Sequence, residues 1–70
     1  MTFADALKAL KEGKKVRRES WFNRVAFIYL KTNKDDSYVI LVHWNYGEEK
    51  DTYWEAGQHD FFAEDWFVVK

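Results

Sequence analysis

Residues 54–70 carry the side chains best suited to bind a polar ligand. Asp65 directly precedes Trp66, and Gln58 follows Trp54 by four residues. A carboxylate beside an indole ring can accept hydrogen bonds from ribose hydroxyls or from a base amine while the ring stacks on the base. Asp65 has no evident local structural role, so a ligand contact and a buried structural contact both stay open. We therefore predict Trp54, Gln58 and Asp65 as ligand-binding residues.

A second candidate cluster lies where a basic run meets a polar loop. Arg18 stands three residues before Trp21, so a guanidinium and a ring could together hold a phosphate and a base. The more common interpretation of the run Lys14–Arg18 is a solvated strand edge whose charges discourage aggregation. Trp21 and Phe22 are large rings in a loop and must pack against something, which marks the loop as a candidate site. Arg18, Trp21 and Asn23 complete the predicted ligand-binding set.

Catalytic and metal chemistry find little support in the residue spacing. His43 and His59 stand on separate segments and lack the short spacing of paired metal ligands. No Ser stands in a nucleophile-elbow context, and no Gly-rich phosphate loop is present. Asp60 is interpreted as the cap of a short helical turn. We predict that the protein is not an enzyme and has no catalytic residue, no metal site and no cofactor.

One helix and several strands must position these groups. Thr2 and Asp5 form a capping-box pattern, apolar residues recur at helical spacing over residues 3–12, and Gly13 ends the segment. Strands are predicted at 14–18, 25–31, 37–44, 51–54 and 65–69, with a hairpin turn at 33–36 and a helical turn at 61–63. The fold class is α+β: a small curved antiparallel sheet of about four to five strands, one N-terminal helix and a short helical turn before the last strand.

Composition and net charge indicate the number of domains and limit the possible partners. The 70 residues are expected to form one domain, residues 1–70, and the absence of Cys excludes disulfides. Aromatic residues make up 20% of the chain, more than a small core can hold, and the strands at 25–31 and 37–44 are apolar on both faces; both observations favour a homo-oligomer. The net charge of −1 argues against binding of long nucleic acid. No signal peptide or membrane span is recognised, so we expect a cytoplasmic protein with no membrane partner.

The two ends of the chain resemble a known family. The opening residues 1–21, MTFADALKALKEGKKVRRESW, and the closing pattern from Trp54 to Val69, with its two Asp residues and Trp66, are similar to the small phage anti-Thoeris proteins of the second type. The resemblance implies a sponge that binds cyclic ADP-ribose-type immune signals in the host cytoplasm without catalysis. It also implies homotetramers with ligand pockets between protomers. Relatives are associated with anti-CRISPR activity and with cyclic oligonucleotides.

Two functions follow as alternatives. The first is a sponge for a cyclic nucleotide, in which Trp21 and Trp54 stack on bases, Arg18 balances phosphate charge, and Asn23, Gln58 and Asp65 bind sugar or base edges. The second is a protein–protein inhibitor of a host defence effector, of the anti-CRISPR kind. A deep pocket lined by Arg18, Trp21 and Asp65 would favour the sponge, whereas a flat exposed aromatic patch would favour the inhibitor.

Overall fold

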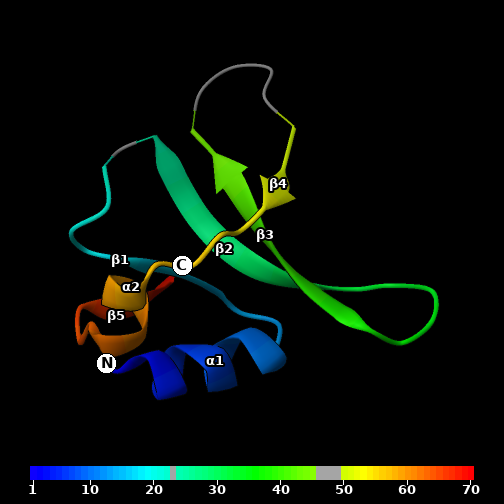
Figure 1. Ribbon diagram of the computed structural model, residues 1–70, viewed down its shortest axis with the longest axis horizontal. Coiled ribbons are helices and arrows are strands. Elements are labelled where there is room, and N and C mark those ends of the chain that lie inside the picture. The colour runs from blue at the N-terminus through cyan, green and yellow to red at the C-terminus, as the bar shows by residue number, and fades with distance from the viewer. Residues whose placement is uncertain (23, 46–49) are drawn as a thin grey trace.

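The fold is an antiparallel sheet with its helices on one side (Figure 1). The computed structural model describes residues 1–22, 24–45 and 50–70. All neighbouring strands are antiparallel, in the order β4-β3-β2-β1-β5. This arrangement confirms the predicted α+β class. The elements are α1 (Phe3–Lys11), β1 (Lys15–Arg18), β2 (Val25–Thr32), β3 (Tyr38–Trp44), β4 (Thr52–Tyr53), α2 (Gln58–Phe62) and β5 (Trp66–Val69).

Both ends of α1 are fixed as the sequence predicts. The Asp5 N–H donates to the Thr2 hydroxyl, and the Asp5 carboxylate accepts from the Thr2 N–H, each at 3.3 Å. At the other end Gly13 has a φ of 85° and its N–H donates to the Leu10 carbonyl. The next N–H, of Lys14, donates to the Ala9 carbonyl. These two bonds form a Schellman motif, which turns the chain from α1 into β1.

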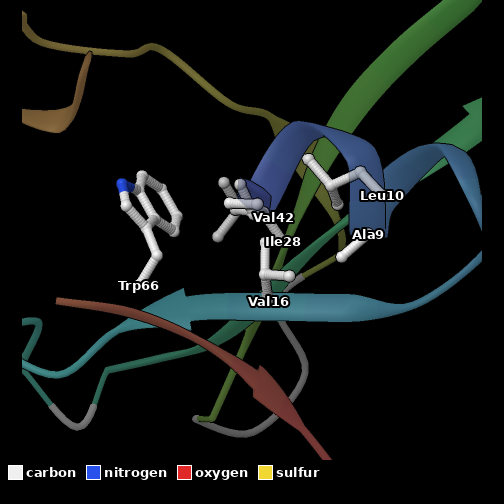
Figure 2. Close-up of a cluster of buried hydrophobic side chains, with 7 residues drawn as sticks. Ala9, Leu10, Val16, Ile28, Val42 and Trp66 are labelled. Atoms are coloured by element: carbon white, nitrogen blue, oxygen red, sulfur yellow. The ribbon is translucent and has the colours of Figure 1, made fainter. Parts of the chain in front are cut away.

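The core lies between α1 and the sheet, as Figure 2 shows. Its fully or nearly fully buried members come from the helix and from four strands: Ala6, Ala9, Leu10, Val16, Ile28, Val42 and Trp66. Val16 is 0% exposed because α1 packs against β1, which pairs with β2 on one side and with β5 on the other. The first and last strands of the sequence are thereby joined, which brings the C-terminal segment beside the β1–β2 loop.

Several boundaries differ from the prediction. β1 begins one residue later, and β4 is reduced to Thr52–Tyr53. The prediction that Asp60 caps a turn over 61–63 was wrong, because α2 begins at Gln58 and its N-cap is Gly57. Asp60 instead sits in the first turn, where its carboxylate accepts from the Gly57 N–H at 2.8 Å. The carboxylate therefore supports the helix start from inside the helix.

The sheet face opposite α1 is bare among the described residues, and its side chains bind one another. Phe27 stacks on His43 with ring centroids 4.8 Å apart, and the Lys15 ammonium lies 4.7 Å from the Phe27 centroid. His43 Nδ1 lies 2.9 Å from the Asp51 carboxylate, which also accepts from the Tyr29 hydroxyl. The Tyr29 hydrogen bond is the larger cause of a lowered Asp51 pKa, with His43 second. The expectation that a partner covers this face stays a prediction.

Several large rings remain outside the core, as expected from the aromatic content. Phe22 and Phe62 are 85% and 84% exposed, and Tyr38, Tyr53, Phe61 and Phe67 are also exposed. Within the described residues, neither helix has the length and apolar character needed to cross a membrane.

Candidate functional site

A groove of about 710 Å³ opens beside the short strand β4. It lies where β2 starts and β3 ends, and its walls come from the β1–β2 loop, the end of β3, the segment 52–55 and α2. Its volume falls within the range of about 300–1,000 Å³ typical of small-molecule sites. Aromatic side chains dominate the lining: Trp21, Phe22, Trp44, Tyr53 and Trp54.

Trp66 fixes the positions of two of these rings. It is 2% exposed and lies 5.2 Å from Trp21 and 6.0 Å from Trp54 between ring centroids, both edge to face. Trp21 and Trp54 also contact each other at 6.3 Å, and Phe3 of α1 contacts Trp54 at 6.1 Å. Such edge-to-face pairs each add about 0.5–1.5 kcal/mol beyond area burial. Trp21 and Trp54 therefore pack against the core, which holds them in place before any ligand binds.

The indole N–H groups divide into satisfied and available donors. Trp66 donates to the Asp60 carbonyl at 3.0 Å, and Trp44 donates to the Thr52 hydroxyl at 3.1 Å. Within residues 1–22, 24–45 and 50–70, the side chains of Trp21 and Trp54 have no hydrogen-bond partner, and no buried side-chain donor there is unsatisfied. Their N–H groups thus reach solvent in or beside the groove and can donate to a ligand oxygen.

Arg17 secures the loop that carries Trp21. Its guanidinium donates to the Trp21 and Val25 carbonyls at 2.9 Å each, and to the Arg18 carbonyl at 3.3 Å. These bonds satisfy backbone acceptors at both ends of the β1–β2 loop. A residue that the sequence places on a solvated strand edge therefore positions one wall of the groove.

Arg18 is held by two carboxylates beneath the groove. Its Nε donates to Asp65 at 2.8 Å and its Nη1 to Asp60 at 2.9 Å, and its side chain is 18% exposed. Asp65 also accepts from the Ser20 N–H at 3.0 Å. The Arg18 hydrogen bond, helped by Ser20, lowers the Asp65 pKa to about 2, and Asp65 followed by Asp60 raises the Arg18 pKa. This cluster ties β1 to α2 and β5, so Asp65 has a clear structural role.

The six predicted ligand-binding residues do not all line one cavity. Trp21 and Trp54 line the groove. Arg18 and Asp65 pair with each other and are not among the lining residues. Gln58 is exposed at the start of α2 and also lies off the groove lining. Asn23 lies outside the described residues.

The groove also contains polar residues that were not predicted from the sequence to bind ligand: Ser20, Arg24, Thr52, Glu55 and Asp60. Arg24 stands three residues after Trp21, as Arg18 stands three residues before it, so spacing alone could not separate the two cations. Carboxylate partners decide between them, and these partners come from more than 40 positions along the chain. Glu55 follows the predicted strand at 51–54, and no motif in the sequence indicated it as a binding residue.

Metal coordination has no support in the described part of the chain. No cluster of three or more His, Cys, Asp or Glu side chains occurs there. His43 pairs with Asp51 on the bare face of the sheet, away from the groove. His59 is exposed on α2.

Comparison with known proteins identifies relatives over nearly the whole chain. The sequence profile of the family described as "Tad2-like: Thoeris anti-defense 2-like domain" matches residues 1–69. A protein of Bacillus phage SP01, named Thoeris anti-defense 2, is 29% identical over 86 aligned positions. The alignment covers 99% of this chain and 94% of that protein.

Proposed function

Because the chain belongs to the Thoeris anti-defense 2-like family, we propose that it counters bacterial defence by binding a cyclic nucleotide immune signal and withholding it from its effector. Family membership supports the anti-defence role against Thoeris. The mode of action is an inference from the groove. The ligand class proposed is a cyclic ADP-ribose isomer or a small cyclic oligonucleotide, bound without chemical change in the host cytoplasm.

The aromatic groove is the observation that carries this proposal. Trp21, Trp44 and Trp54 line a space of about 710 Å³, large enough for a ligand with one or two bases. Stacking of a base on an aromatic side chain contributes about 1–3 kcal/mol. The available N–H groups of Trp21 and Trp54 add donors for sugar or phosphate oxygens. Stacking faces and polar donors in one preformed groove suit a nucleotide better than a purely apolar ligand.

Sequestration without catalysis agrees with the polar groups of the groove. Asp60 is occupied by Arg18 and by the Gly57 N–H, so it is poorly placed to take a proton from a substrate. Among the described lining residues, the other carboxylate is that of the exposed Glu55, and the candidate nucleophiles are the hydroxyls of Ser20, Thr52 and Tyr53. No histidine that could activate these hydroxyls occurs in the described part of the lining.

We further propose that the protein works as a homo-oligomer, with a tetramer as the expected state. Exposed rings such as Tyr53 (74%) and Phe62 (84%), together with the bare sheet face, offer apolar area that a monomer leaves in water. Size-exclusion chromatography with light scattering gives the mass directly. A single peak of about 8.5 kDa would contradict this part of the proposal.

Calorimetric titration with cyclic ADP-ribose isomers and cyclic di- and trinucleotides tests ligand binding. At least one compound is expected to bind, and heating the complex should release it unaltered, as measured by mass spectrometry. Trp54→Ala should weaken binding, whereas Tyr38→Ala, which removes an exposed ring away from the groove, should not. Failure of every compound to bind, or recovery of a cleaved product, would refute sequestration.

A protein–protein inhibitor is the second candidate, and the exposed rings favour it. Phe22 and Phe62 lie almost fully in solvent, where a hydrophobic contact with an effector would bury them. Phe62→Ser separates the two functions, because Phe62 is exposed and lies off the groove lining, whereas Phe22 is part of that lining. Loss of anti-defence activity in infected cells with unchanged nucleotide binding would favour the inhibitor, whereas retained activity with unchanged nucleotide binding would favour the sponge.

A further inference from the structure

We propose that Arg24 is the residue that recognises the phosphate of the sequestered ligand and thereby sets its specificity. This assignment rests on the proposed function and replaces Arg18 in that role. Arg24 lines the groove and is exposed immediately before β2. Its guanidinium forms no hydrogen bond or ion pair with any other residue in the described ranges. It can therefore offer its full set of N–H donors to a phosphate.

The other cations near β1 are already occupied. Arg18 is neutralised by Asp60 and Asp65. Arg17 donates to three backbone carbonyls. Lys15 lies over the Phe27 ring on the opposite face of the sheet. Among the described residues that line the groove, Arg24 is the one with a basic side chain.

The backbone of Arg24 is held in place, although its side chain has no partner among the described residues. Its carbonyl accepts from the Asn45 N–H at 2.7 Å, which joins the start of β2 to the end of β3. The following residue, Val25, offers its carbonyl to Arg17 at 2.9 Å. The Arg24 side chain thus projects from a fixed point. A cation on a fixed backbone loses less conformational freedom when it binds than one on a mobile segment.

Glu55 gives the groove a second polar group of opposite charge. Within the described residues its carboxylate has no ion-pair or hydrogen-bond partner, and it is exposed. A carboxylate accepts from sugar hydroxyls or a base amine and repels additional phosphates. The pair therefore selects a ligand that carries phosphate at one side and free hydroxyl or amine donors at another. A nucleotide with a phosphate or diphosphate linkage and free ribose hydroxyls fits this description, and a polyphosphate does not.

The test compares Arg24→Gln with Lys34→Gln, a matched loss of one positive charge in the β2–β3 turn away from the groove. The probe is the cyclic ADP-ribose isomer that binds the wild-type protein most tightly in calorimetry, with adenosine as the phosphate-free comparison. Because a charged hydrogen bond contributes about 1.5–3 kcal/mol, Arg24→Gln should weaken probe binding by about 10–150-fold. Lys34→Gln should leave it within about twofold, since a surface charge outside the site contributes little. Adenosine should bind both variants and the wild type equally.

The outcomes separate this assignment from the proposed function. If Arg24→Gln binds the probe as tightly as the wild-type protein does, the role of Arg24 is refuted. The proposal that the protein sequesters the ligand is not affected by that result. A parallel loss of adenosine affinity would also overturn it, because the residue would then act through something other than phosphate. If no cyclic ADP-ribose isomer binds the wild-type protein, both the proposed role of Arg24 in phosphate recognition and this ligand class are refuted. Circular dichroism of both variants shows whether the fold is retained.

Discussion

Replacement of Trp66 by Phe should destabilise the protein far more than the same replacement at Trp54. Trp66 is 2% exposed, contacts Phe3, Trp21 and Trp54, and donates its N–H to the Asp60 carbonyl at 3.0 Å. Trp54 is only partly buried, and its N–H has no partner within the described residues. The same chemical change therefore tests a core ring against a groove ring.

The expected magnitude follows from these contacts. Losing the partly buried hydrogen bond costs about 1–2 kcal/mol, because the carbonyl loses its partner. The smaller phenyl ring leaves a gap that costs roughly another 1 kcal/mol. The sum of about 2–3 kcal/mol is a large part of the 3–5 kcal/mol that a domain of this size typically has. Trp54→Phe should cost less than about 1 kcal/mol, because its surroundings are open to solvent.

Urea unfolding followed by far-ultraviolet circular dichroism measures both values, and thermal unfolding gives a second estimate. A loss of 2 kcal/mol corresponds to a decrease in Tm of about 8–16 °C for a chain of this length. Trp54→Phe should instead lower ligand affinity, since it removes an available N–H donor. Equal destabilisation by the two variants, or a Trp66→Phe variant as stable as the wild type, would refute the assignment of Trp66 to the core and Trp54 to the groove.

Three further outcomes are expected. Arg18→Met should lower the free energy of unfolding, and Tm by several degrees, because Asp60 and Asp65 lose their shared cation. A variant that is as stable as the wild type but binds ligand more weakly would show that Arg18 acts in ligand binding instead. Asp65 has a folded pKa of about 2, below its value of about 3.9 in an unfolded chain, so its stabilising effect is complete above about pH 4 and is lost as the pH falls towards 2. Asp65→Asn should flatten that part of the profile of urea midpoint against pH, and an unchanged slope would contradict it. Gly13→Ala should cost about 1 kcal/mol through the φ of 85° alone, since no other atom lies within 4 Å of the added Cβ; no loss in urea unfolding would disprove the backbone argument.

Local patterns predicted the elements well because their signals lie within a few residues. The Thr2–Asp5 box and Gly13 fixed both ends of α1, and the β-branched runs gave β2 and β3 with boundaries shifted by one residue. The predicted boundary was wrong where two local signals compete for the start of a helix. Gly57 and Asp60 can each begin a helix, and the Gly57 N–H bond to the Asp60 carboxylate decides the start.

The candidate site could be predicted only in part, because its polar residues are chosen by distant neighbours. The sequence by itself determined the family, the α+β class and the surplus of rings, since these depend on residue types and short spacing. It also indicated Trp21 and Trp54 as ligand-binding residues, and the structure places both in the lining of one groove. Only the tertiary structure decided which cation is available: pairing of β1 with β5 brings Asp65 and Asp60 onto Arg18 and leaves Arg24 unpaired among the described residues. An ion pair between residues 47 positions apart depends on strand pairing, which no local pattern encodes.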